Sequence, residues 1–271
     1  MKQTKRVAIS VISIGRNCSG SVEGTFRSVM NQEFDSFEYI IIDGASTDGT
    51  LEHVKSMLGG DSRITLVSEP DDGISDAMNR GVHFANGTLV IHLHFGDKFV
   101  NEKVLARAWS SYLSNGWSWA AGNLRITRKG HEAGDFTFRP SSASNLRRKN
   151  CVPHQATFIR VSEFIAAGGF DVSLTQAMDY DLWLRLHYVR KLELFDLHMD
   201  VASFDSTGES SRIFSLLKGS FTVRRRLSQT YGVNLGILED IVFMCRIVAY
   251  WIYYKTKSVF GPKATNDIFN G

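Results

Sequence analysis

Cysteine is scarce in this chain, and its three cysteines stand far apart. Cys18, Cys151 and Cys245 show no C-x-x-C spacing. This pattern supports neither a disulfide framework nor a structural zinc site. We therefore expect the protein to work in a reducing, cytoplasmic environment.

The chain also lacks a strong excess of charge of either sign. Its 271 residues include 31 basic and 28 acidic ones, which gives a formal net charge of +3. So small a net charge favours no particular class of partner, and nucleic acid is not expected to bind. The 43% of apolar residues suffice for one large core, so we expect one elaborated α/β catalytic domain followed by a tail.

An uninterrupted apolar run of membrane-spanning length is missing from the C-terminal part. The stretch 237–260 is rich in aliphatic and aromatic residues, but Glu239, Asp240 and Arg246 interrupt it, whereas a spanning helix needs ~20 mainly apolar residues. We predict a helix that lies at the membrane surface; the alternative is a helix packed on the catalytic domain. The basic residues expected to meet anionic lipid headgroups are Arg224, Arg225, Arg226, Lys255, Lys257 and Lys263.

Strands and helices are expected to alternate over the first hundred residues. The β-branched run 7–14 is typical of a strand buried on both faces of a parallel sheet, and it is too short for the core of a signal peptide. The pattern predicts strands at 7–14, 37–42, 64–67 and 88–93 and helices at 22–30, 51–58 and 74–84. This alternation indicates a mostly parallel central sheet with helices on both faces.

The pattern is weaker after residue 97. We predict helices at 104–113 and 179–188 and strands at 119–125 and 158–159. The polar stretch 128–150 shows little apolar periodicity. Because long loops in compact domains usually have a function, we expect acceptor contacts or a lid there.

Carboxylates follow three of the predicted strands. Asp43 ends the second strand, Asp71 follows the third, and Asp97 is expected to end the fourth. Ligands of open α/β sheets bind outside the carboxyl ends of the strands, so these side chains should converge. Taken singly, each aspartate is more typical of a turn or a helix cap than of a binding site, and it is the order and spacing of the three that favour a site.

Five ordered segments resemble the large family 2 of inverting glycosyltransferases with the GT-A fold. This family includes enzymes of bacterial exopolysaccharide, O-antigen and colanic acid synthesis, and the resemblance covers residues 7–211. The segments are SVISIGRN from Ser10, IIIDGASTDGT from Ile40, SEPDDGISDAMNRG from Ser68, HLHFGD from His92, and PHQATFIR from Pro153, the last followed by GGFD and AMDYDLWLRL.

The resemblance implies a role for each matching residue. Asp43 is similar to the carboxylate that recognises the nucleotide base, and Asp71 with Gly73 matches the loop beside the base and ribose. Asp97 matches the acid that binds Mg²⁺ or Mn²⁺. Asp179 is similar to the general base that deprotonates the acceptor hydroxyl.

Three further residues are expected to support the site or to contact the acceptor. Asp181 would act through a salt bridge or hydrogen bond, whereas His154 and Gln155 would approach the acceptor or the diphosphate. For His154 a buried core position is the alternative.

One segment departs from the family pattern. Many members carry Asn-Ser-Asp-Asp after the fourth strand, but this chain has His94-Phe95-Gly96-Asp97, so one acid is missing. A single aspartate is sufficient if phosphate and water complete the metal's coordination. His94 could add a nitrogen ligand, which would favour manganese, or its ring could face away from the metal.

The sequence thus predicts a metal-dependent hexosyltransferase that uses a nucleoside-diphosphate sugar and a glycan or lipid-linked acceptor. We expect a GT-A catalytic domain at 1–211, with a nucleotide-binding half at 1–100 and an acceptor-binding half at 101–211. A helical tail at 212–271 would hold the protein at the inner face of the cell membrane. The alternatives are a sugar-phosphate nucleotidyltransferase and a non-catalytic paralogue that only binds nucleotide sugar.

Overall fold

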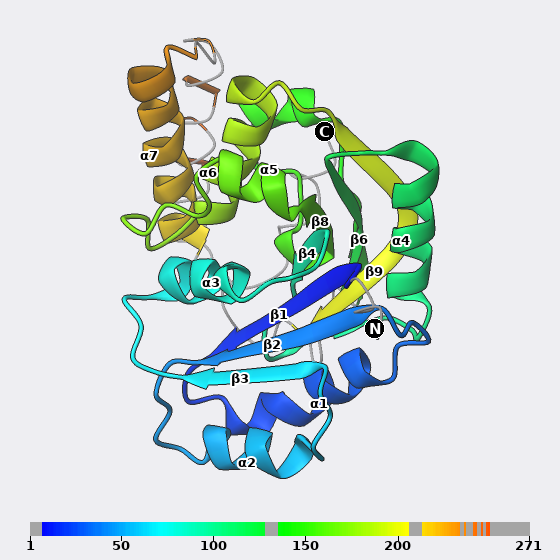
Figure 1. Cartoon of the computed structure of the whole chain (residues 1–271). Coiled ribbons are helices and arrows are strands. Elements are labelled where there is room, and N and C mark those ends of the chain that lie inside the picture. The colour runs from blue at the N-terminus through cyan, green and yellow to red at the C-terminus, as the bar shows by residue number, and fades with distance from the viewer. Residues whose placement is uncertain are drawn as a thin grey trace.

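The alternation of strands and helices predicted for the first hundred residues is present in the structure. The structure is a computed structural model and describes residues 7–127, 135–205 and 213–233, together with residues 236, 241, 242, 245, 248 and 249. The first elements are β1 (Ile9–Gly15), α1 (Ser19–Met30), β2 (Phe37–Asp43), α2 (Thr50–Met57), β3 (Ile64–Ser68), α3 (Ile74–His83) and β4 (Leu89–His92) (Figure 1).

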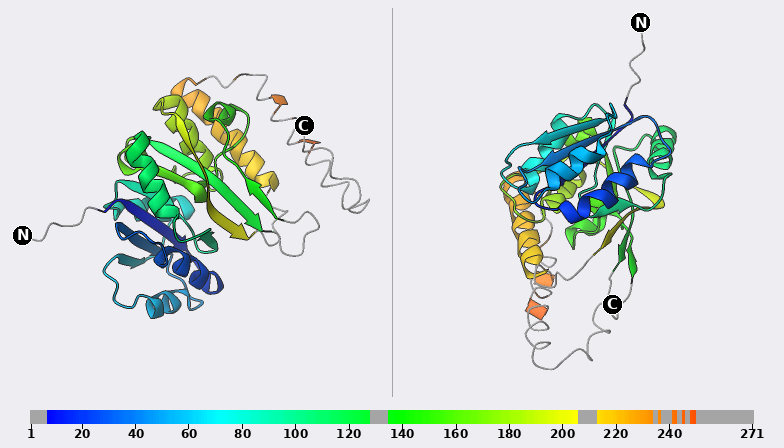
Figure 2. Two further views of the ribbon diagram at one scale, coloured as in Figure 1. Left: turned by 90° about the vertical axis from the view of Figure 1, so that its right-hand side faces the viewer. Right: turned by 90° about the horizontal axis from the view of Figure 1, so that it is seen from below.

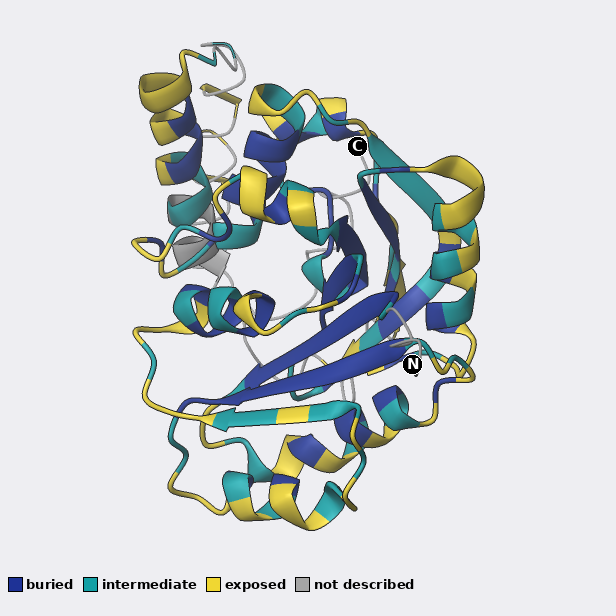
Figure 3. Cartoon of the chain, viewed as in Figure 1, coloured by how far each residue is buried: buried dark blue, intermediate teal, exposed yellow. Residues whose placement is uncertain are grey.

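The first four strands form a parallel sheet in the order β3-β2-β1-β4. Successive residues of a strand point to opposite faces, and both faces of β1 and β2 are covered. Ile12 and Ile40 pack with α3 on one face, whereas Val11 and Ile41 pack with α1 and α2 on the other. Figure 3 shows β1 and β2 buried along their length and the edge strand β3 partly exposed. This burial explains why the β-branched run at 7–14 shows no polar alternation.

The second half of the sheet is mixed and curls away from the first (Figure 1). From β4 the order continues β8-β6-β9-β5, and β7 pairs with β6; β6–β9 is the parallel pair of this half, while β4–β8, β6–β8, β5–β9 and β6–β7 are antiparallel. The elements are β5 (Asp97–Phe99), α4 (Val104–Asn115), β6 (Trp119–Thr127), β7 (Phe136–Phe138), β8 (Thr157–Arg160), α5 (Val161–Ala166), α6 (Met178–Leu184), a π-helical turn (Arg185–Val189) and β9 (Leu194–Asp205).

The described part of the polar stretch 128–150 contains more structure than the sequence indicates. Besides β7 it forms a 3₁₀ helix at Ala143–Arg147, in which Ala143 and Leu146 are buried in the same core cluster as α6. Residues 128–134 lie outside the described residues. The segment after β7 therefore packs against the start of α6, where the sequence predicts the catalytic residue Asp179.

Helix α7 (Ile213–Tyr231) packs beside α6 at one side of the fold (Figures 1 and 2). Val223 and Leu227 are buried in the α6 core cluster. Arg224 is only 2% exposed and donates hydrogen bonds to the carbonyl oxygen of Arg147 and, at 3.4 Å, to Tyr180 Oη. The expectation that Arg224 meets lipid is therefore wrong, because its guanidinium satisfies polar groups inside the protein.

The neighbouring basic residues of α7 differ from Arg224. Arg226 forms an ion pair with Asp171 at 2.7 Å, and Arg225 is exposed. The membrane-surface helix predicted at 237–260 lies largely outside the described residues. Among the helices that are described, none combines the length and the apolarity needed to cross a bilayer.

Replacing Arg224 with methionine should destabilise the fold. The substitution removes a buried guanidinium that donates charge-assisted hydrogen bonds to Arg147 O and Tyr180 Oη, so we expect the free energy of unfolding to fall by about 2–3 kcal/mol. Urea unfolding of the variant measures this change. Arg225→Met on the same turn is the control, because an exposed residue should change the value by less than about 0.5 kcal/mol. Equal effects of both substitutions would refute the buried role of Arg224.

Candidate active site

Asp43 lies where the sequence predicts it, as the last residue of β2, and it is fully buried. Its Oδ2 accepts hydrogen bonds from Ser68 Oγ at 2.7 Å and from the Ser46 amide at 3.1 Å. Its Oδ1 is buried and has no hydrogen-bond partner in the described part of the chain. A buried oxygen without a donor costs about 1–3 kcal/mol, and a ligand N–H group would remove that cost.

Asp71 lies next to the loop that follows Asp43. Gly44 is so close to Asp71 Oδ2 that a Cβ atom added at Gly44 would overlap this oxygen. Asp71 Oδ1 accepts a hydrogen bond at 3.0 Å from the amide of Gly73, whose φ of +112° precedes the start of α3. The fold therefore brings together the three residues predicted to bind the nucleotide, namely Asp43, Asp71 and Gly73.

Replacing Gly44 with alanine should weaken nucleotide binding. The new methyl group would displace the Asp71 carboxylate, and we expect the Kd for a nucleoside diphosphate to rise roughly tenfold, which is about 1.4 kcal/mol. Calorimetric titration measures this. The matched control is Gly20→Ala in α1, where an added Cβ meets no atom within 4 Å. An unchanged Kd in Gly44→Ala would show that the Asp71 carboxylate does not contact the nucleotide.

Asp97 begins β5 and does not end β4, which corrects the prediction from the sequence. The chain turns between the two strands at Gly96, which has a φ of +107°. Thr25 in α1 holds this turn, because its hydroxyl accepts from the Gly96 amide at 3.0 Å and donates to Asp97 O at 2.6 Å. The amide of Phe95 in this turn donates to Ile14 O at 3.5 Å, so the turn lies beside the carboxyl end of β1.

The Asp97 carboxyl is buried, with 4% of its surface exposed. Its Oδ2 accepts a hydrogen bond at 3.2 Å from the His94 amide, and the Gln155 side chain also hydrogen-bonds to it. Burial raises the pKa of Asp97 to about 7, and these hydrogen bonds oppose the rise. A cation bound near Asp97 would therefore strongly favour the deprotonated form of its carboxyl group over the protonated form.

His154 and Gln155 connect Asp97 to Asp179. Gln155 contacts Asp97, and the adjacent His154 has its Nδ1 4.0 Å from Asp179 Oδ2. Asp179 lies in the first turn of α6, where its Oδ1 accepts a hydrogen bond from the Tyr180 amide at 2.7 Å. The structure thus gathers four of the predicted site residues into one continuous group.

His94 lies beside this group. Its ring centroid is 5.3 Å from that of His154. Burial lowers the pKa of both imidazoles, so both rings are neutral near pH 7; the proximity of His154 also lowers the pKa of His94, and Asp179 partly opposes the shift at His154. Both ring nitrogens of His94 and Nε2 of His154 are buried without a partner among the described residues. They are available to hydrogen-bond a bound ligand.

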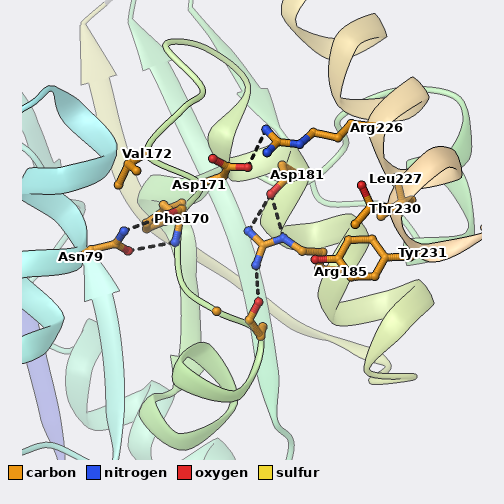
Figure 4. Close-up of a pocket in the computed structure, with 12 residues that line it drawn as sticks. Asn79, Phe170, Asp171, Val172, Asp181, Arg185, Arg226, Leu227, Thr230 and Tyr231 are labelled. Carbon is orange, nitrogen blue, oxygen red and sulfur yellow. Dashed lines mark hydrogen bonds and ion pairs between the residues drawn. The ribbon is translucent and has the colours of Figure 1, made fainter.

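Asp181 lies on the other side of α6 from Asp179. Two residues along a helix turn the side chain by about 200°. Asp181 forms the salt bridge that the sequence predicts, with Arg185 at 2.6 Å, and Arg185 also donates to the carbonyl oxygens of Ala167 and Gly169. Both charged groups face a cavity of about 430 Å³ between α6, the loop after α5, and α7 (Figure 4). Asp181 therefore braces this loop and does not touch the residues around Asp97.

The described residues hold no cluster of three or more His, Cys, Asp or Glu side chains with the arrangement of a complete metal site. The three cysteines are free. Asn150, which the sequence does not predict as a site residue, donates from Nδ2 to Asp179 Oδ2 at 2.9 Å. The two residues are 29 positions apart, and no local pattern indicates such a contact.

Comparisons with known proteins identify the family and the fold. The family described as "Glycosyl transferase family 2" matches residues 10–128. An uncharacterized glycosyltransferase of Mycobacterium tuberculosis is 32% identical over 232 residues, which cover 82% of this chain and 86% of the relative.

The solved structures that share the fold include the following two. One is residues 1–349 of TarS from S. aureus in complex with UDP-GlcNAc, with a TM-score of 0.68, 13% identity, and coverage of 95% of this chain and 77% of that one. The other is the mannosyltransferase PcManGT from Pyrobaculum calidifontis in complex with GDP-Man and Mn²⁺, with a TM-score of 0.63, 13% identity, and coverage of 96% and 77%. The predicted α/β class and GT-A fold are confirmed, and the chain belongs to glycosyltransferase family 2.

Proposed function

We propose that the chain transfers a hexose, with inversion at the anomeric carbon, from a nucleoside-diphosphate sugar to a hydroxyl group of a glycan or lipid-linked acceptor. The observation that carries the proposal is the continuous group Asp97–Gln155–His154–Asp179. In this group Gln155 and the adjacent His154 link the Asp97 carboxyl, which would hold a cation, to the Asp179 carboxyl, which would act as a base. These are the two functions that such a transfer requires.

The donor nucleotide would bind at the ends of β2 and β3. The unpartnered Asp43 Oδ1 can accept an N–H group of the base, and the Asp71–Gly73 loop would lie beside the ribose. Uridine and guanine both carry a ring N–H donor. A uridine or guanosine diphosphate sugar is therefore our proposed donor, in keeping with the ligands of the two proteins that share the fold.

A divalent cation, Mg²⁺ or Mn²⁺, would bind at Asp97. The side chains fit such an ion only in part: one buried carboxylate with a raised pKa is present, and a second acid is missing. Diphosphate and water oxygens would complete the coordination, and His94 is the remaining candidate ligand. When bound, the cation would offset the negative charge that builds up on the departing diphosphate.

Asp179 would act as the general base. As the acceptor oxygen forms its bond to the anomeric carbon, the bond from that carbon to the diphosphate breaks. The hydroxyl proton passes to the Asp179 carboxylate. The neutral imidazole of His154 lies beside this carboxylate and can orient the acceptor by a hydrogen bond from or to its free Nε2.

The acceptor would bind in the half at 101–211, and the half at 1–100 would hold the nucleotide. Asp179, His154 and Gln155 belong to the first of these halves, whereas Asp43 and Asp71 belong to the second. A cytoplasmic location at the inner face of the membrane, with the tail at 212–271 as the attachment, remains part of the proposal. Its support is the apolar and basic composition of 237–260.

The test is hydrolysis of a panel of uridine and guanosine diphosphate sugars with Mg²⁺ or Mn²⁺, since water can replace an unknown acceptor. We expect one donor to be turned over, and only with metal present. Metal-dependent binding without turnover, even with glycan acceptors added, would favour the non-catalytic alternative. Formation of a nucleotide sugar from a nucleoside triphosphate and a sugar phosphate would instead identify a nucleotidyltransferase.

A further inference from the structure

We propose that Asn150 is a positioning residue that fixes the Asp179 carboxylate for proton abstraction. The inference rests on the proposed function, because it takes Asp179 as the general base. It adds a residue from the segment between β7 and β8, outside the five segments that carry the resemblance to the family.

The Asn150 amide is oriented by two hydrogen bonds. Its Oδ1 accepts from the Val152 amide at 3.3 Å, and its Nδ2 donates to Asp179 Oδ2 at 2.9 Å. The flipped amide would place an NH₂ group against the Val152 N–H and an oxygen against the carboxylate, so it would lose both bonds. The orientation with the donor toward Asp179 is therefore required by the surroundings.

Asp179 is held at both carboxylate oxygens. The Tyr180 amide donates to Oδ1 at 2.7 Å, and Asn150 donates to Oδ2. Each oxygen keeps a further lone pair, so the carboxylate can still accept a proton. A carboxylate fixed at both oxygens has lost the side-chain rotation that would otherwise spread the base over several positions.

Asn150 is itself placed by α6, the helix that carries Asp179. Tyr180 Oη donates to the Leu146 carbonyl oxygen, and Trp183 Nε1 donates to the Val152 carbonyl oxygen at 3.2 Å. These two bonds hold the backbone on both sides of Asn150. The base and its hydrogen-bond donor therefore move as one unit, which is what precise positioning requires.

The test compares three variants in the hydrolysis of UDP-GlcNAc and GDP-mannose with Mn²⁺, using the donor that the parent chain turns over. We expect Asn150→Ala to lower kcat roughly 10- to 100-fold, as displacement of a reacting group by about 1 Å does, with the donor KM within about twofold. Asn150→Asp keeps the acceptor for the Val152 amide but loses the donor to Asp179, so we expect no rescue. Asn145→Ala is the control, because Asn145 lies in the same segment and hydrogen-bonds Ser141, not Asp179.

Each outcome decides the proposal. A parent-like kcat in Asn150→Ala would overturn the proposal. A parent-like kcat in Asn150→Asp would also overturn it, because Asn150 would then serve only the turn at Val152. A rise in donor KM with unchanged kcat would also overturn it. If Asn150→Ala fails to fold, Asn150→Asp decides the question, since it preserves the turn. Parent-like kcat in Asp179→Asn would instead refute the proposed base, which separates the failure of the proposed function from that of this inference.

Discussion

Replacing Asp179 with asparagine should lower kcat by roughly 10²- to 10⁴-fold, the range that a lost general base typically costs. Asparagine has nearly the same shape and keeps an oxygen for the Tyr180 amide, so the start of α6 should be preserved. What the variant loses is the ability to take up the acceptor proton. Rates with saturating donor and Mn²⁺ measure the effect.

Donor binding should be almost unchanged in this variant. His154 and Gln155 lie between Asp179 and Asp97. Asp179 therefore takes no part in the nucleotide site proposed at the ends of β2 and β3. Asp196→Asn on β9 is the control for replacing a carboxylate away from the site, and it should keep the parent kcat. If Asp179→Asn retained parent turnover, another group would have to act as the base.

Replacing Asp97 with alanine should abolish metal-dependent donor hydrolysis, with a loss of at least ~10²-fold in kcat/KM. Asp97 supplies the one carboxylate proposed for the cation, and no second acid lies at this turn to replace it. Titration with Mn²⁺ in the presence of a nucleoside diphosphate should show that the variant has lost the metal-dependent part of its affinity. Full metal-dependent turnover in Asp97→Ala would place the cation elsewhere or remove it from the mechanism.

The raised pKa of Asp97 also predicts how the stability of the metal-free protein changes with pH. Burial raises the pKa of its carboxyl to about 7 in the folded chain, compared with about 3.9 in an unfolded one. The folded state therefore holds the proton more tightly, and this contribution to stability is complete below about pH 4 and is lost as the pH rises toward 7.

Without metal, the melting temperature of the parent should accordingly fall between about pH 4 and pH 7. The fall should be smaller in Asp97→Asn, which has no titrating group at position 97. Added Mn²⁺ should raise the parent's Tm at pH 7 and leave that of the variant unchanged. Identical pH profiles for the two proteins would show that the Asp97 pKa is not raised. Calorimetric scans at several pH values provide the measurement.

The nucleotide half of the fold could be predicted because its signals are local. These signals are the β-branched run at 7–14, the aspartates at the end of β2 and after β3, and the glycine-rich turns. Each of them determines the structure of only a few neighbouring residues. A strand buried on both faces has to be apolar throughout, and parallel strands have to end at one edge. The convergence of Asp43 with Asp71 follows from these two constraints.

The second half could be predicted less well because it is built by long-range pairing. The twelve-residue strand β9 alternates strictly between apolar and polar residues from Phe195 to Val201, which is a local strand signal, but its partners lie far away in the sequence. It forms because β6 and β5 supply hydrogen-bond partners on its two sides. The contact between Asn150 and Asp179, and the burial of Arg224, depend on packing of the same kind.

The burial of Arg224 bears on where the polypeptide can be shortened. A chain that ended at residue 211 would lack α7, and the Arg147 carbonyl oxygen and the apolar surface under Val223 and Leu227 would face water. That surface belongs to the core cluster that includes α6. A chain that ended after Tyr231 would keep these contacts, so attempts to separate the enzyme from its C-terminal segment should divide the polypeptide there.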